Sequence, residues 1–219
     1  MKIGLLTLGV LVIGVVAVFA MSDVYVSGTW RYKMTVEVKT PEGIKTGSAV
    51  HEISNSATSI DIMSFPESGN PATFRGEAVV IEMGEGKPPL FAIRETNPEW
   101  MFYYTFPTPD DGATTVGGIK YYKNLESGTQ KTVNPKYYPR FVTFTDMDDA
   151  RTVTIINNEN IKEFYGDGFH INNIKITITN EPIPKPRILE GLPKFDDEFW
   201  KWLKTLKYGD PKRISGANF

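Results

Sequence analysis

Apolar and polar residues alternate without exception from Trp30 to Lys39, and this pattern restricts the fold more than any other feature of the sequence. A repeat of two over this length, in residues that favour extended backbone, predicts a β-strand with one buried face. The apolar set comprises Trp30, Tyr32, Met34, Val36 and Val38. A second clear strand is expected at Phe169–Thr179, where an alternating stretch places Ile174, Ile176 and Ile178 on one face and Lys175, Thr177 and Thr179 on the other. The chain is therefore expected to be built mainly from β-strands.

The residues Thr40-Pro41-Glu42-Gly43 reverse the chain after the first strand, and a return strand is expected from Ile44 to Ile53. Proline sets φ at the start of the turn and glycine permits a positive φ at its end, which favours a three-residue loop with a bulge. That register places His51 opposite Lys33 on the polar face. A two-residue loop would instead place His51 opposite Tyr32 in the core, because a shift of one residue moves every side chain to the other face. Both registers remain open.

Further strands are expected in five stretches, namely Ser59–Ser64, Phe74–Met83, Leu90–Arg94, Arg140–Thr145 and Thr152–Ile156. The aromatic run Trp100–Phe106 is compatible with one more strand. Residues from Pro107 to Pro139 mix proline, glycine and aspartate with two tyrosine pairs. They are interpreted as a long excursion with a short helix or hairpin, because a structureless loop of this length is unusual inside a domain.

Two short helices are expected. Asn157 or Asn158 caps the first, which runs to about Tyr165 before Gly166. The second covers residues 196–208, begins at the cap Asp196, and is amphipathic. Its apolar stripe comprises Phe199, Trp202, Leu203 and Leu206. A proline-rich linker over residues 182–195 precedes it. The fold class is therefore mostly β, a single β-sandwich-like or curved-sheet domain over residues 21–181 with two short helices and an N-terminal hydrophobic helix.

The N-terminal segment from Ile3 to Ala20 carries no charge. As a helix it would be roughly 27 Å long, close to the hydrocarbon thickness of a bilayer. Small residues at Val18 and Ala20 would suit cleavage before Met21, which predicts a signal peptide; the length of the apolar run favours an uncleaved anchor instead. Both alternatives direct the rest of the chain to a bacterial cell envelope, with the body in the periplasm.

Composition excludes several functional classes. The net charge is −2, so binding to nucleic acid has no electrostatic support. The chain has no cysteine, which removes disulfides, thiolate nucleophiles and cysteine-ligated zinc. There is no phosphate-binding glycine loop, nucleophile elbow or paired-histidine metal motif. We therefore predict no catalytic residue, no cofactor and no metal.

Both histidines and several aspartates could bind a metal ion, but each of them also has a purely structural explanation. His51 and His170 could meet in space and bind a metal, but their spacing gives no support. Asp146, Asp148 and Asp149 could bind calcium, yet aspartate is also a common turn residue. Asp110-Asp111-Gly112 is similar and weaker.

Aromatic residues are the best candidates for binding a partner. In the middle of the chain these are Trp100, Tyr103, Tyr121 and Tyr122, and in the terminal helix Trp200 and Trp202. Exposed aromatic rings are enriched at interfaces. The alternatives are that the first group alternates into a β core and that the helix packs on the protein's own sheet.

Four stretches carry a resemblance to a known family: GTWRYKMTVEVKTPEG (28–43), RGEAVVIEMGEGKPPLFAI (75–93), YPRFVTFTDMDDARTVTII (138–156) and FYGDGFHINNIKITITNEPI (164–183). Together they resemble a family of uncharacterised bacterial envelope proteins. The resemblance implies an envelope β domain and no activity, cofactor or catalytic residue. The tail after Pro193 departs from that family.

The expected function is a non-enzymatic envelope module that binds a protein or cell-wall partner, with the membrane contacted through the N-terminal helix. The alternative is an envelope hydrolase that acts on glycan or ester bonds through carboxylates such as Glu77, Glu82 or Asp146.

Overall fold

The computed structural model describes residues 25–58, 71–109, 112–185 and 191–219. The expected export segment Ile3–Ala20, the expected strand Ser59–Ser64 and the pair Asp110-Asp111 lie outside the described residues. The chain divides into a smaller and a larger unit. The smaller comprises Met1–Trp30, Ile53–Thr73 and Pro107–Leu125, and the larger comprises Arg31–Glu52, Phe74–Phe106 and Glu126–Phe219.

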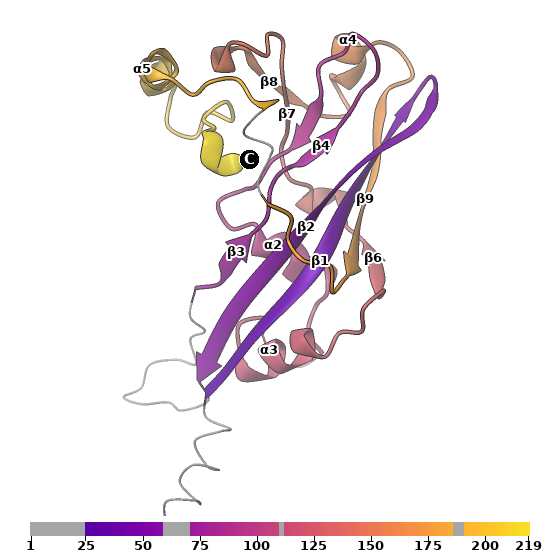
Figure 1. The fold of residues 1–219 in the computed structure, drawn as a ribbon, viewed down its shortest axis with the longest axis vertical. Coiled ribbons are helices and arrows are strands. Elements are labelled where there is room, and N and C mark those ends of the chain that lie inside the picture. The colour runs from indigo at the N-terminus through magenta and orange to yellow at the C-terminus, as the bar shows by residue number, and fades with distance from the viewer. Residues whose placement is uncertain (1–24, 59–70, 110–111, 186–190) are drawn as a thin grey trace, which may run out of the picture. The chain divides into compact units, whose positions relative to one another are not determined.

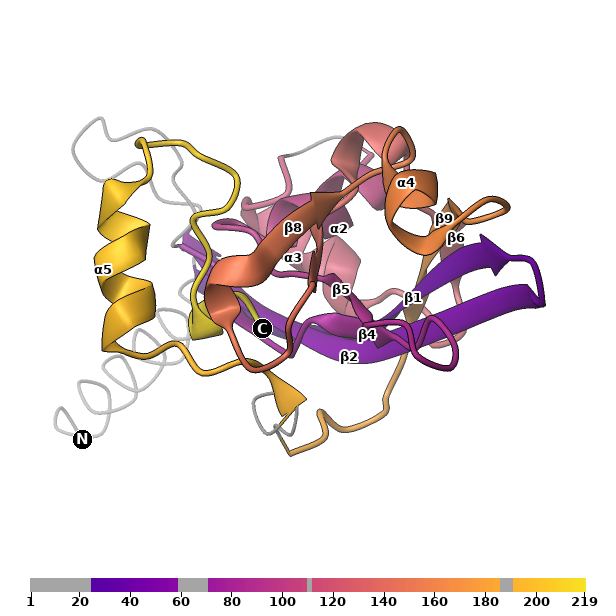
Figure 2. The same cartoon turned by 90° about the horizontal axis from the view of Figure 1, so that it is seen from above.

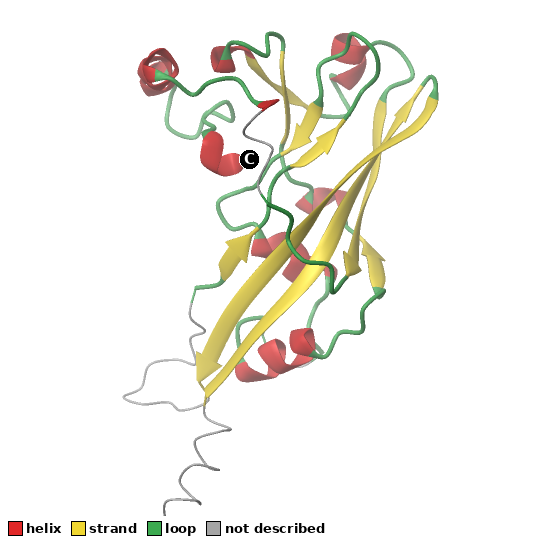
Figure 3. Ribbon diagram, in the orientation of Figure 1, coloured by secondary structure: helices red, strands yellow, loops and turns green. Residues whose placement is uncertain are grey.

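The described residues are mostly β, as the alternation predicts, and their strands form two antiparallel sheets (Figures 1 and 3). The first sheet has the order β3-β2-β1-β9-β6, with strands Thr73–Arg75, Gly43–Thr58, Tyr25–Thr40, His170–Ile178 and Gln130–Thr132. The second has the order β4-β5-β7-β8, with strands Val79–Ile81, Leu90–Ala92, Phe141–Phe144 and Val153–Ile156.

The two alternating stretches become β1 and β9, which pair with each other. Met34 lies opposite Ile176, and Val36 lies opposite Ile174. All five apolar residues predicted for one face of β1 are buried, as are the three isoleucines of β9. The predicted faces of both strands are therefore confirmed.

The first hairpin takes the two-residue loop, so the favoured three-residue register is wrong. Strand β1 ends at Thr40 and β2 begins at Gly43. The hydroxyl of Thr40 closes the turn, because it accepts from the Glu42 amide at 3.2 Å and donates to the Gly43 carbonyl at 2.9 Å. As a result the rings of Tyr32 and His51 lie 5.1 Å apart, centre to centre, and His51 is in the core.

The predicted strand Phe74–Met83 is broken into β3 and β4. Gly76 separates them with φ of +139°, a backbone conformation that side chains with a Cβ rarely adopt. A Cβ at this position would lie 2.4 Å from Cδ2 of His51. The break therefore makes room for the histidine ring.

Four α-helices lie in the described residues: two were predicted, one falls where a short helix or hairpin was expected, and one replaces an expected strand. They are α2 Glu99–Thr105, α3 Val116–Lys123, α4 Ile161–Tyr165 and α5 Asp197–Thr205. Three short 3-10 turns accompany them, η1 Pro135–Tyr137, η2 Ala150–Thr152 and η4 Gly216–Asn218. Helix α3 falls in the expected excursion. The N-cap position of α4 is Asn160 and not Asn157 or Asn158, although the Asn160 side chain makes no capping hydrogen bond, and Gly166 follows its last residue.

The aromatic run Trp100–Phe106 is helix α2 and not a strand. Phe102 and Phe106 are four residues apart, both are buried, and their rings stack at 5.1 Å. Residues four apart share a face in a helix and also in a strand, so the pattern alone did not separate the two.

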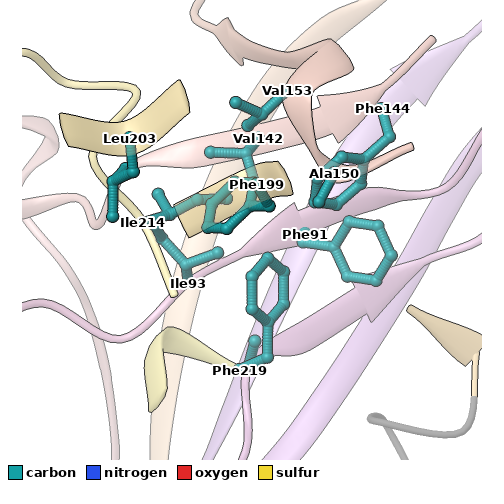
Figure 4. Packing of buried hydrophobic residues seen from close by; sticks show 11 residues of the cluster. Phe91, Ile93, Val142, Phe144, Ala150, Val153, Phe199, Leu203, Ile214 and Phe219 are labelled. Atoms are coloured by element: carbon teal, nitrogen blue, oxygen red, sulfur yellow. The ribbon is translucent and has the colours of Figure 1, made fainter. Parts of the chain in front are cut away.

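Helix α5 packs on the protein's own sheet. Asp196 caps it by accepting from the Phe199 amide at 2.9 Å, as predicted. Phe199 and Leu203 point into a cluster with Val142 and Phe91 of the second sheet (Figure 4). After α5 the chain turns back (yellow in Figure 2), and the Ala78 amide donates to the carbonyl of Phe219 at 2.7 Å.

The backbone around Gly47 of β2 leaves no space for a side chain at this position. A Cβ there would lie 2.0 Å from the carbonyl oxygen of Val80, which is backbone and has to move. We expect Gly47→Ala to lower the free energy of unfolding by about 1–3 kcal/mol in urea denaturation. Gly191→Ala is the control, because no heavy atom lies within 4 Å of a Cβ there. Equal stability of the two variants would contradict the close approach of β2 to Val80.

Candidate ligand-binding cavity

A cavity of about 180 Å³ lies in the larger unit. Its wall is built from β1, β2, β3, β5, α2 and η1, so residues far apart in sequence meet around it. Most of the wall is apolar or aromatic, including Met34, Phe74, Met101 and Tyr138. Cavities of this character are the usual sites at which proteins bind small ligands or apolar side chains.

His51 is the central polar group of the wall. Its side chain is 2% exposed, and Nε2 lies 2.7 Å from the carbonyl oxygen of Glu77. A carbonyl can only accept, so Nε2 carries the proton and Nδ1 is left as an acceptor. Burial lowers the pKa of His51 to about 4, and the nearby positive charge of Arg94 acts in the same direction. The ring is therefore neutral at physiological pH.

Tyr32 lies beside this histidine on β1. It is fully buried, it stacks on Phe102 at 5.0 Å, and it meets the His51 ring edge to face. Burial raises the pKa of its phenol, and the charge of Glu99 adds to the effect. The phenol therefore stays protonated and is a hydrogen-bond donor.

Two arginines make different contacts at the cavity: Arg94 lines the wall and follows the end of β5, whereas Arg140 lies beside the wall and directly precedes β7. Arg94 donates through Nη2 to the carbonyl of Ala217. Arg140 binds Glu95 instead, with Nε 2.8 Å from the carboxylate and the backbone amide 3.0 Å from the same oxygen. Glu95 is thus paired with Arg140, while Arg94 is a cation of the cavity wall that lies near the charge of Glu77.

The rim of the cavity carries exposed aromatic rings. Trp100 is 43% exposed and Tyr104 is 50% exposed, although both line the cavity. Tyr104 stacks on Tyr137 of η1 at 4.2 Å with the planes nearly parallel. Both rings are therefore partly open to solvent beside the cavity.

The residues predicted to bind a partner are not gathered in one place. Trp100 lines the cavity, whereas its neighbour Tyr103 is buried in the core. In the smaller unit Tyr122 is buried against Trp30 at 5.0 Å, and Tyr121 lies beside it on α3. On α5, Trp202 packs against the apolar cluster. Trp200 is 42% exposed and does not line the cavity.

The candidate metal ligands are used in other ways. His170 is exposed at the start of β9, and the cavity wall contains His51 alone of the two histidines. The Asp146 side chain accepts from the Asp148 amide at 2.8 Å, and Asp149 binds Arg151. Within the part of the chain that the structure describes, no group of three or more histidine and acidic residues is placed to hold a metal ion.

Comparison with protein-family models, with curated proteins and with solved structures found no match to this chain. Among the helices of the described residues, none combines the length and the apolar character needed to cross a bilayer.

Sequence reasoning missed most of the cavity. Arg94, Tyr137 and Tyr138 were not singled out, because nothing in their local sequence distinguishes them from surface residues. Two signals pointed here: Trp100, which was among the aromatic candidates, and the hairpin register, which decides whether His51 lies beside Tyr32.

Proposed function

We propose that this chain is a non-enzymatic envelope module that binds a protein partner by holding one of its apolar side chains in the cavity beside His51. The size of the cavity carries the proposal. An engineered cavity of about 150 Å³ holds one benzene molecule, so about 180 Å³ accommodates a single ring. The apolar wall suits such a ring better than a sugar, whose hydroxyl groups would lose their hydrogen bonds to water.

The placement of the acids favours binding over hydrolysis of glycan or ester bonds. Glu77 lines the cavity, but Glu82 and Asp146 are exposed and do not. Glu95 also lines the cavity, and its carboxylate is engaged by Arg140. A glycosidase needs a second carboxylate placed to act with the first.

The proposed localisation to the cell envelope is based on the uncharged segment Ile3–Ala20 and on the resemblance to envelope proteins of unknown activity. In this proposal the segment directs export, and the two antiparallel sheets form a β-sandwich-like module outside the cytoplasm. Fractionation of cells with intact-mass measurement distinguishes a cleaved signal, with mass starting at Met21, from an anchor that stays attached.

Trp100→Ala tests the site itself. We expect this variant to bind toluene about threefold to tenfold more weakly than the wild type in an NMR titration, because it loses an aromatic contact at the rim. Trp200→Ala is the matched control, since Trp200 has nearly the same exposure, 42% against 43%, and lies away from the cavity. Toluene that does not bind the wild type, or equal weakening by both variants, would contradict the proposal.

A further inference from the structure

Three residues that line the cavity each carry a buried polar atom with no hydrogen-bond partner among the described residues. These atoms are Oη of Tyr32, Nδ1 of His51 and Nε of Arg94. A buried polar atom without a partner is costly, so several of them at one cavity call for an explanation such as a bound molecule. These atoms indicate which hydrogen-bond donors and acceptors a bound molecule should carry at its polar end.

The three atoms need different hydrogen-bond partners. The phenol of Tyr32 and Nε–H of Arg94 are donors and need an acceptor. Nδ1 of His51 is an acceptor and needs a donor, because Nε2 already donates to the Glu77 carbonyl. An occupant that satisfies this set must both donate and accept.

From this set we infer that the ring held in the cavity is a phenol, the side chain of a tyrosine in the partner protein. Its O–H donates to Nδ1 of His51, and its oxygen accepts from Tyr32 or Arg94. The inference rests on the proposed function and names the residue type that this function requires.

Other polar groups fit the wall less well. A carboxylate cannot donate to Nδ1, so this atom would stay without a partner. An ammonium group cannot accept, so Tyr32 and Arg94 would stay unpaired, and it would repel the Arg94 cation. A carboxamide both donates and accepts, but it adds three heavy atoms to a ring where the hydroxyl adds one, and the cavity holds little more than a ring.

The test compares toluene with p-cresol, which differs only by the hydroxyl. We expect p-cresol to bind the wild type about threefold to tenfold more tightly, the effect of one or two hydrogen bonds. Tyr32→Phe should reduce this preference, and it should fold without loss of stability because it removes an unpaired hydroxyl. Tyr165→Phe is the matched control, since Tyr165 is a buried tyrosine outside the cavity.

A second measurement does not depend on any variant. The ¹⁵N resonance of Nδ1 of His51 should move when p-cresol binds and stay in place when toluene binds, with exposed His170 as the internal reference. N-acetyl-tyrosinamide should compete with p-cresol, and failure to compete would overturn the assignment to a protein side chain. If toluene and p-cresol bind equally, the phenol inference fails while the proposed function stands; if neither binds, both fail.

Discussion

Replacing Phe199 by alanine is expected to lower the free energy of unfolding by about 3–5 kcal/mol, the range for a fully buried phenylalanine. Its ring is 1% exposed and lies between α5 and the second sheet, at 4.9 Å from Phe195 and 5.5 Å from Trp202. The variant leaves a hole that the sheet residues cannot fill, because Val142 and Phe91 are held in β-strands. Urea denaturation followed by circular dichroism measures the loss.

The neighbouring tryptophan provides the control within the same helix. Trp200 is 42% exposed, so Trp200→Ala should change stability by no more than about 1 kcal/mol. If Phe199→Ala were as mild as Trp200→Ala, α5 would not pack on the sheet through this face. The helix would then be free to bind a partner, as the sequence analysis expected of Trp200 and Trp202.

Lowering the pH from 6.5 to 4 is expected to remove about 3 kcal/mol of stability through His51 alone. The pKa of His51 is lowered from 6.5 to about 4 in the folded protein. Between these values the unfolded chain binds a proton that the folded chain does not, so stability rises with pH across the window and is lost as the pH falls. A shift of one pKa unit corresponds to about 1.4 kcal/mol.

His51→Gln separates this effect from the titration of carboxylates. Glutamine does not titrate, and its amide can still donate to the Glu77 carbonyl, so the variant should lose the step between pH 6.5 and 4. His170→Gln should keep the step, because His170 is exposed on β9. A step that survives in His51→Gln and disappears in His170→Gln would show that His51 is not the buried neutral histidine described here.

The long alternating strands could be predicted because their burial is encoded locally. From Trp30 to Lys39 of β1 and from Ile174 to Ile178 of β9, residues alternate between the core and the other face in a repeat of two. The cap at Asp196 and the glycine after α4 could be predicted for the same reason, since they act within one helical turn.

The aromatic run and the broken strand could not be predicted, because tertiary contacts decide them. Phe102 and Phe106 suit either a helix or a strand until their partners in the core are known. Gly76 interrupts β3 and β4 because the His51 ring, 25 residues away in sequence, occupies the space beside it. No short segment contains both residues.

The cavity could be predicted even less well from the sequence, because it too depends on tertiary contacts. Its polar end combines Tyr32 of β1, His51 of β2 and Arg94 after β5, and its rim comes from α2. The predicted list of aromatic residues included Trp100 but also Tyr103 and Tyr122, which are buried. Trp100 differs from the two tyrosines in its exposure and in its position at the cavity, and both properties depend on the fold.

The most direct test of the central claim is a crystal structure of the protein soaked with 4-bromophenol, in which anomalous scattering locates the bromine. We expect a bromine site at the cavity near Trp100 and Tyr104, with the hydroxyl toward His51 and Arg94. A bromine site found only elsewhere on the protein, or an unoccupied cavity at saturating ligand, would contradict the central claim.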